Sequence, residues 1–252
     1  MLDLTVDGPV AWLTLSRPAK RNALSPQLLR TLIAHCEAVE AHDDVRVLGL
    51  RAEGETFCAG ADLLASLPEL SGPDGEAAAE LGRQAASALA SLSVPTVAQV
   101  QGACVGGGVV LCSACDLVVA GASARFRVPE LSLGVPFAWG GTTRLAALVG
   151  VRVAADWVLS GRWVAADEAL DRGFVSRVVP DDALGDAVTE LANAVAQAPR
   201  AVTRYTKQQL QRAAEGRPDD DADAVALVAA LRDPESMAAA QRYLAAQVGT
   251  GR

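Results

Sequence analysis

Two glycine-containing turns, each placed between an apparent strand and an apparent helix, constrain the fold of this chain more than any other feature. The first is FCAGADL at 57–63, which follows the apolar run VRVLGLRA. The second is GACVGGGVVL at 102–111, which follows PTVAQVQ. Glycines at a helix start expose backbone N–H groups, because no Cβ keeps a ligand away. Two such turns that converge on one point could stabilise a negative charge developing on oxygen.

The length and composition indicate one large domain, or one domain with a small appendage. The chain has 252 residues, of which 51% are apolar and 21% charged, which is ample material for a core. Its net charge of −8 argues against a nucleic-acid-binding surface.

No apolar run approaches the roughly 20 residues of a membrane helix, and residues 1–15 do not resemble a signal peptide. With five scattered cysteines, we expect a cytoplasmic protein with reduced thiols and no membrane insertion.

The pattern along the chain predicts an α/β fold with a recurring strand–strand–helix rhythm. Ser25 and Pro26 mark a helix start, and an apolar stripe continues to about His42. An Ala-rich helix follows the turn-rich segment ELSGPDGE and ends near Leu92. Strands are predicted by alternating or apolar runs at 10–16, 45–52, 95–101 and 116–120, with another short strand around Phe126.

From about Pro199 onward the sequence shows only helical patterns. Such helices cannot bury their apolar faces alone, so they must dock on the core or on another subunit. We therefore predict a core over residues 1–198 and a C-terminal helical region over 199–252.

The glycines and cysteines fit no familiar cofactor or metal motif. A G-x-G-x-x-G pattern started at Gly106 meets Leu111 where its last glycine belongs, and no Walker lysine follows. Cys112 and Cys115 form a lone C-x-x-C with no second pair and no nearby histidine, so we expect them to be packing residues. No metal site is predicted.

Among the acidic residues, Glu130 is the strongest candidate for chemistry. It follows Pro129 and has apolar neighbours in RVPELSLGVPFAWGG. Partial desolvation there would raise the pKa of its carboxyl group and suit it to proton transfer. An ordinary strand-end or N-cap carboxylate is the alternative interpretation. Asp62 looks more like a first-turn helix residue that the helix dipole favours.

Several segments, in order and spacing, resemble the signatures of the crotonase (enoyl-CoA hydratase/isomerase) superfamily over essentially the whole chain. They are RPAKRNALS, FCAGADL, GACVGGGVVLCSACDLVVA, FRVPELSLGVPFAWGGTTRLAALVG, SGRWVAADEALDRGFVSRVVPDDAL and PESMAAAQRYL. The resemblance implies a spiral core of stacked ββα units with a helical C-terminal trimerisation region, and assembly as a homotrimer or a dimer of trimers. It also implies acyl-CoA substrates, with coenzyme A part of the substrate and no separate cofactor.

The same resemblance implies roles for individual residues. The N–H groups of Ala61 and Gly107 would form an oxyanion hole for the thioester carbonyl. Lys20 and Arg21 would lie near the phosphates of coenzyme A, although both could equally be ordinary solvated charges. The other predicted substrate-binding residues are Ala59, Asp62, Leu63, Gly106, Val110, Phe137 and Trp139. The candidates for lining the acyl pocket are Leu64, Leu67, Leu70, Phe137 and Trp139, and each of them could equally be a core residue.

One departure from the family pattern bears on the reaction. Hydratases of the family carry two glutamates, and Val110 stands at the position of the first, so only Glu130 remains. Dienoyl isomerases place an aspartate where this chain has Ala138. Adding water requires two acid–base groups, whereas a 1,3-proton shift requires one carboxylate, so the sequence favours an isomerase-like reaction. A hydratase of fatty-acid β-oxidation, a decarboxylase or thioesterase, and a catalytically silent acyl-CoA-binding protein remain open alternatives.

Overall fold

The computed structural model describes residues 1–249, with side chains described to residue 245; residues 250–252 of the predicted C-terminal region lie outside the described residues. The strands are β1 (Leu2–Asp7), β2 (Val10–Leu15), β3 (Val47–Ala52), β4 (Thr96–Val100), β5 (Ala103–Val105), β6 (Leu117–Gly121), β7 (Arg125–Arg127), β8 (Val164–Ala165) and β9 (Arg177–Val179). The helices are α1 (Pro26–Glu40), α2 (Leu63–Leu70), α3 (Gly75–Ala90), α4 (Gly107–Ser113), α5 (Gly141–Val149), α6 (Val151–Ser160), α7 (Ala166–Asp171), α8 (Leu184–Ala196), α9 (Arg200–Ala214), α10 (Asp223–Ala230) and α11 (Pro234–Gly249). Short 3₁₀ turns are η1 (Pro18–Lys20), η2 (Glu130–Leu133), η3 (Asp181–Ala183) and η4 (Asp220–Ala222).

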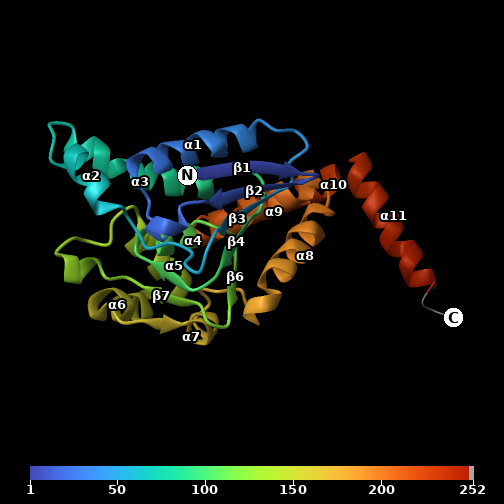
Figure 1. Ribbon diagram of the computed structural model, residues 1–252. Coiled ribbons are helices and arrows are strands. Elements are labelled where there is room, and N and C mark those ends of the chain that lie inside the picture. Colours follow the sequence, from blue (N-terminus) through green and yellow to red (C-terminus); the bar gives the residue numbers. More distant parts are fainter. Residues whose placement is uncertain (250–252) are drawn as a thin grey trace.

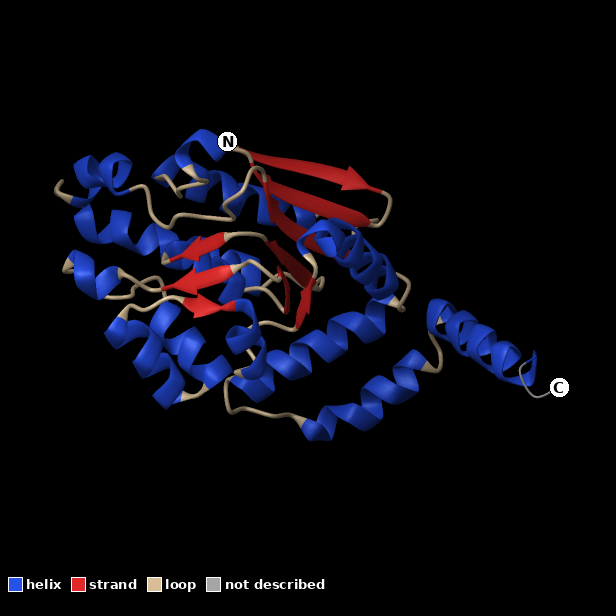
Figure 2. Ribbon diagram, turned by 60° about the horizontal axis from the view of Figure 1, so that its bottom comes forward, coloured by secondary structure: helices blue, strands red, loops and turns tan. Residues whose placement is uncertain are grey.

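The strands form two sheets, and helices cover both faces of the larger one (Figures 1 and 2). The larger sheet has the order β1-β2-β3-β4-β6-β9, with β1 antiparallel to β2 and the remaining neighbours parallel. Alternation along β2 sends Leu13 toward the core cluster that includes α1, α3 and α4, and sends Trp12 toward α8. The smaller sheet has the order β5-β7-β8.

The strand–strand–helix rhythm is a structural repeat. In two successive repeats, β4 and β6 lie in the larger sheet, β5 and β7 lie in the smaller sheet, and α4 and α5 follow. The preceding repeat has β3 in the larger sheet, and its Cys58 pairs in parallel with Cys104 of β5. The Val105 N–H donates to the Cys58 carbonyl oxygen at 2.9 Å. Because parallel pairing keeps equivalent residues side by side, this register brings Ala61 next to Gly107.

The predicted α/β fold class is confirmed, and most predicted elements lie within a few residues of their expected bounds. The predicted helix from Ser25 begins as expected, since the Ser25 hydroxyl caps it by accepting a hydrogen bond from the Leu28 N–H at 3.3 Å. The turn-rich segment is shorter than predicted, because α2 continues to Leu70 and α3 already begins at Gly75. Strand β1 was not predicted. It is a largely exposed edge strand.

The C-terminal region begins with α9, which is anchored to the core by Lys207. The Lys207 side chain is only 5% exposed, and its Nζ lies 2.8 Å from an Asp116 carboxylate oxygen and 2.9 Å from the Val94 carbonyl oxygen. Helices α10 and α11 follow, and α11 extends away from the body (Figures 1 and 2). The domain boundary after residue 198 falls between α8 and α9 and stays a prediction.

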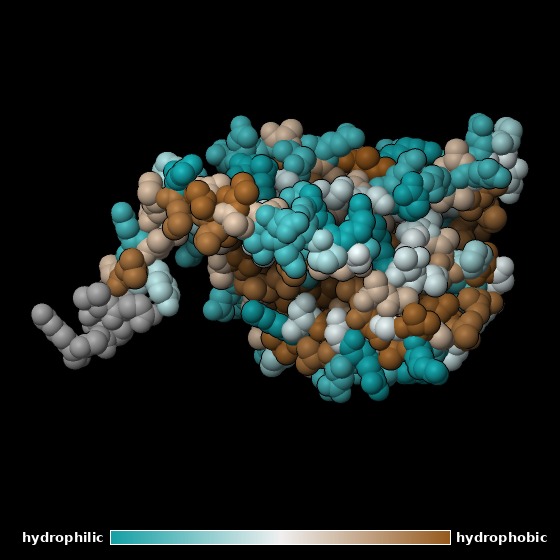
Figure 3. Space-filling model, turned by 180° about the vertical axis from the view of Figure 1, so that it is seen from behind, coloured by the Kyte–Doolittle hydropathy of each residue, from teal (hydrophilic) through white to brown (hydrophobic). Residues whose placement is uncertain are grey.

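Apolar side chains gather on the outside of α10 and α11 (Figure 3). The exposed ones are Val225, Leu227, Val228, Leu231, Met237, Tyr243 and Leu244. Within residues 1–249, no helix has both the length and the apolar character needed to cross a membrane.

Candidate active site

The two glycine-containing turns meet at one point. Leu24 pairs with Ala61: the Leu24 N–H donates to the Gly60 carbonyl oxygen at 2.8 Å, and the Asp62 N–H donates to the Leu24 carbonyl oxygen at 2.9 Å. Because successive N–H groups of an extended segment point to opposite sides, the Ala61 N–H points away from Leu24. A Cβ built on Gly60 would lie 3.6 Å from the Gly107 nitrogen. Among residues 1–249, neither the Ala61 nor the Gly107 N–H donates a hydrogen bond.

Both amides line a cavity of about 370 Å³ that is bounded mainly by apolar side chains from α1, α2, α3, α4 and the loop after η2. A volume of this order is at the lower end of small-molecule pockets. Most predicted site residues line this one cavity, namely Ala59, Ala61, Leu63, Gly106, Gly107, Val110, Glu130, Phe137 and Trp139.

Glu130 is the first residue of η2 and is aimed at the second glycine turn. Gly106 has φ +50°, and a Cβ at this position would overlap Glu130 Oε1, so only glycine allows the carboxylate to approach the turn. The other carboxylate oxygen, Oε2, is buried and has no hydrogen-bond partner within residues 1–249. Burial raises the pKa of the Glu130 carboxyl group, because a low-dielectric surrounding disfavours the charged form.

Arg127 connects the second glycine turn to the segment behind Glu130. Its carbonyl oxygen accepts a hydrogen bond from the Gly106 N–H at 2.9 Å. Its Nε donates to the Gly161 carbonyl oxygen at 2.7 Å. Gly161 has φ +59°, and a Cβ there would lie 3.4 Å from the Val128 carbonyl oxygen. The chain at Gly161 therefore supports the backbone that leads into the Glu130 turn.

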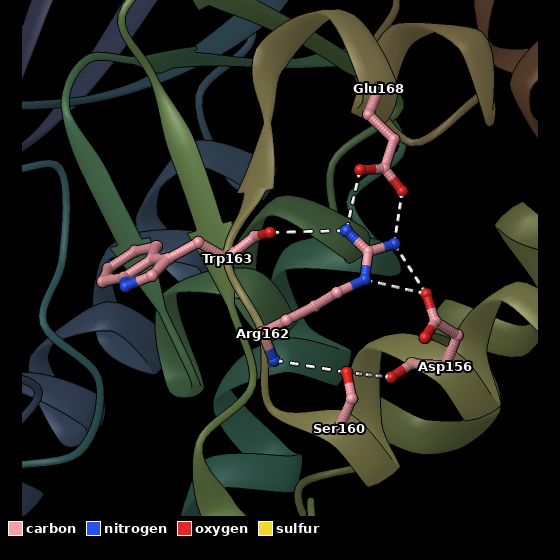
Figure 4. Close-up of polar contacts among 5 residues, drawn as sticks. All are labelled: Asp156, Ser160, Arg162, Trp163 and Glu168. Atoms are coloured by element: carbon pink, nitrogen blue, oxygen red, sulfur yellow. Dashed lines mark hydrogen bonds and ion pairs between the residues drawn. The ribbon is translucent and has the colours of Figure 1, made fainter.

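The corner that contains Gly161 is itself fixed by Arg162 (Figure 4). The Arg162 guanidinium binds two carboxylates, with Nε 2.9 Å from Asp156 Oδ2 and Nη1 2.8 Å from Glu168 Oε2. Its backbone N–H donates to the Ser160 hydroxyl at 3.3 Å. Bidentate contacts of this kind fix geometry as well as adding energy. This network joins α6 to α7 through the segment that leads into β8.

The wall of the cavity contributes one further carboxylate and one buried valine. Val110, one turn into α4, is 1% exposed. Glu69 of α2 carries the second carboxylate among the lining residues, and it is paired with Arg30, whose Nη2 lies 2.6 Å from Glu69 Oε2. Hydrogen bonding to Arg30 lowers the pKa of Glu69. Glu69 is therefore a weak base, whereas Glu130 is the stronger one.

Some predicted residues do not line the cavity. Lys20 and Arg21 are exposed at the end of η1, although the Arg21 carbonyl oxygen accepts a hydrogen bond from the Ala59 N–H at 2.9 Å. Asp62 caps α2 by accepting from the Ala65 N–H at 3.3 Å. It also forms an ion pair with Arg17 at 3.3 Å.

The structure also corrects the predicted acyl-pocket leucines. Leu70 lines the cavity, but Leu64 and Leu67 are 83% and 52% exposed and lie outside it. The reason is that α2 is a short helix with no buried residue, so its apolar residues face both the cavity and the exterior.

Asn22 was missed by the sequence reasoning. It is fully buried, its Oδ1 accepts a hydrogen bond from the Arg17 N–H at 2.9 Å, and its Nδ2 donates to the carbonyl oxygens of Glu53 and Thr56 at 2.9 and 2.8 Å. These bonds hold the polar turn after β2 against the segment that precedes the first glycine turn. An asparagine in a polar turn is the only local signal, and asparagine tolerates the left-handed conformation seen here (φ +56°).

Comparisons with known proteins show which family the chain belongs to. A family model described as enoyl-CoA hydratase/isomerase matches residues 5–231. A 2,3-dehydroadipyl-CoA hydratase of Escherichia coli is 37% identical over 207 residues, which cover 82% of this chain and 80% of the relative. A short-chain-enoyl-CoA hydratase of Clostridium acetobutylicum is 33% identical over 210 residues, covering 83% and 80%.

A crystal structure of an enoyl-CoA hydratase from Bacillus anthracis superimposes with a TM-score of 0.87 at 27% identity, covering 96% of this chain and 95% of that one. The match therefore extends from the glycine turns to the C-terminal helices. The chain belongs to the enoyl-CoA hydratase/isomerase family of the crotonase superfamily, and it is an enzyme of that family acting on CoA thioesters.

Proposed function

We propose that this enzyme shifts the double bond of an enoyl-CoA by a 1,3-proton transfer through an enolate. The observation that carries the proposal is the pairing of Glu130 with a buried Val110 in one cavity. Val110 can neither orient water nor donate a proton. The remaining lining carboxylate, Glu69, is already paired with Arg30. One carboxylate is sufficient for the isomerisation but not for the two-group addition of water.

In the proposed mechanism, the N–H groups of Ala61 and Gly107 donate to the thioester carbonyl oxygen. Glu130 removes a proton from C2 of a 3-enoyl-CoA, and the electron pair moves to the carbonyl oxygen as the enolate forms. The same carboxyl group then returns the proton to C4, and the double bond ends between C2 and C3. Each oxyanion donor contributes about 3–4 kcal/mol to lowering the barrier. Burial makes Glu130 a stronger base than an ordinary carboxylate.

We also propose two kinds of contact outside the cavity. Lys20 and Arg21 would meet the phosphates of coenzyme A, supported by the hydrogen bond that joins their turn to Ala59. The exposed apolar side chains of α10 and α11 would be buried against further copies of this chain. Light scattering would give the oligomeric state, with a homotrimer or a dimer of trimers expected and a monomer contradicting the proposal.

Hydration of enoyl-CoA is the second candidate, because both curated relatives described above are named hydratases. In this case a water bound to Glu130 would add to C3, and the reaction would be limited by the missing second acid.

One assay separates the two functions. The purified enzyme is incubated with crotonyl-CoA and, separately, with 3-hexenoyl-CoA, and the absorbance of the conjugated thioester is followed. Rising absorbance with 3-hexenoyl-CoA is the result expected of an isomerase. Falling absorbance with crotonyl-CoA alone would contradict the proposal and identify a hydratase. Binding of both esters with no change in absorbance would contradict both functions.

A further inference from the structure

Trp139 has a backbone conformation that bulky residues rarely adopt. Its φ is +58°, and the following Gly140 also has a positive φ of +75°. A strained backbone of this kind persists only where the surrounding structure requires it, and it is concentrated at functional sites. The strain directs the indole into the cavity that also contains Glu130.

The indole packs face-on against the backbone of α3 at Gly82. A Cβ built on Gly82 would overlap three successive ring atoms, Cδ2, Cε2 and Nε1, at nearly equal distances, which places it above the ring face rather than at the edge. Glycine weakens a helix relative to alanine, and α3 is otherwise rich in alanine. The space that the indole needs explains the glycine.

The six-membered ring of the indole reaches the second glycine turn. A Cβ built on Gly107 would lie 2.6 Å from Trp139 Cζ3 and 3.3 Å from Cη2. The ring therefore spans the distance from α3 to the residue whose N–H is the proposed oxyanion donor. This places the indole beside the thioester and the first acyl carbons, and not at the far end of the acyl chain.

From these contacts we propose that Trp139 determines the width of the acyl group that the enzyme accepts. The indole is a flat wall that admits an unbranched chain and excludes a branch at C3. The inference deepens the proposed function, since it rests on the oxyanion pair formed by Ala61 and Gly107. It does not depend on proton transfer by Glu130.

The test is the binding of two saturated esters, which undergo no double-bond shift. Calorimetry measures the Kd of butyryl-CoA and of 3-methylbutyryl-CoA for the wild type, Trp139→Ala and Trp139→Leu. In both variants, the Kd ratio is expected to shift toward the branched ester by about fourfold or more, the value of one buried methyl group. The leucine variant keeps the test decisive if the alanine variant does not fold.

Gly82 provides an independent check. Gly82→Ala alone is expected to push the indole into the cavity and weaken the binding of both esters. In the Trp139→Ala background, the methyl group of Gly82→Ala fits into the space that the indole occupied. There, Gly82→Ala is expected to raise the thermal stability. Gly185→Ala in α8 is the matched control, because a Cβ there meets nothing within 4 Å, and it should leave both Kd values unchanged.

An unchanged Kd ratio in folded Trp139→Ala and Trp139→Leu would overturn the inference. The same variants are also titrated with octanoyl-CoA. Tighter binding of this long unbranched ester with an unchanged Kd for 3-methylbutyryl-CoA would overturn the inference too, since it would place the indole at the end of the chain. A shifted ratio in an enzyme that does not isomerise 3-hexenoyl-CoA would support the role of Trp139 and refute only the proposed reaction.

Discussion

Replacing Glu130 by glutamine tests the proposed mechanism most directly. Glutamine keeps nearly the same size and shape but cannot accept the proton from C2. General acid–base catalysis contributes about 10²–10⁴-fold to a rate. The structure favours the upper half of this range, because Val110 cannot replace the lost base and Glu69 is bound to Arg30. We therefore expect kcat to fall by about 10³–10⁴-fold, which corresponds to about 4–5.5 kcal/mol of barrier.

The pH dependence gives the prediction a second component. A base is active when it is deprotonated, so kcat/KM of the wild type should fall as the pH falls through the pKa of Glu130. Burial raises that pKa above the usual 4.5, so the loss should begin at a higher pH than for an ordinary glutamate. The residual activity of Glu130→Gln should not show this decline.

The stability of the variant provides the control. The folded state raises the pKa of Glu130. The protonated carboxyl group therefore makes its full contribution to stability at acid pH, and this contribution is lost as the pH rises through the folded pKa. The ionised carboxylate therefore destabilises the fold at pH 7. Glutamine removes this penalty, so the variant should unfold at a temperature no lower than the wild type at pH 7, and lost activity cannot be attributed to unfolding.

The assay is the initial rate with 3-hexenoyl-CoA, together with the Kd of butyryl-CoA by calorimetry. The expected result is a collapse of kcat with a Kd within a few-fold of the wild type. Activity above a tenth of the wild-type value, with the same acid limb in the pH profile, would refute the role given to Glu130.

Three further predictions concern the cavity wall, the turn after β2 and the ion pair that anchors α9. Val110→Glu should add hydration of crotonyl-CoA. It should also lower the melting temperature, because it places a carboxylate at a position of the cavity wall that is 1% exposed. A folded variant with no added hydration would contradict the view that Val110 replaces the missing acid. Asn22→Ala should lower the free energy of unfolding by about 2–4 kcal/mol in urea titrations, because three part-buried hydrogen bonds of a fully buried side chain disappear. A change below about 1 kcal/mol would be evidence against that role. Lys207→Met should lower the free energy of unfolding by about 1–3 kcal/mol in the same titrations. This is less than the loss expected for a fully buried ion pair, since the Asp116 side chain is 28% exposed. An unchanged free energy of unfolding would show that the pair does not anchor α9.

The sequence was most informative where the signals are local. The Ser25–Pro26 helix start, the apolar strands and the two glycine turns depend on neighbouring residues, and the structure has each of them. Glu130 could be recognised as a desolvated acid because its sequence neighbours are apolar.

The site itself could not be assembled from local signals. The pairing of Cys58 with Cys104 joins residues that are far apart in the chain, and no periodicity shows which turns become neighbours. The convergence of Ala61 and Gly107 was therefore expected only from the family resemblance. The partnership of Trp139 with Gly82 is likewise non-local, and nothing in the sequence around Gly82 indicates an aromatic neighbour.

The pairing of Leu24 with Ala61 has a consequence for how the enzyme uses the distant parts of its substrate. The exposed turn that ends in Arg21 and the proposed oxyanion donor Ala61 belong to one short ladder of hydrogen bonds. A contact that holds this turn in place would therefore also hold the Ala61 amide, which is proposed to face the reacting carbonyl. Thioesters that lack the nucleotide would then lose turnover as well as affinity, because binding energy from the nucleotide would be used to position the thioester carbonyl.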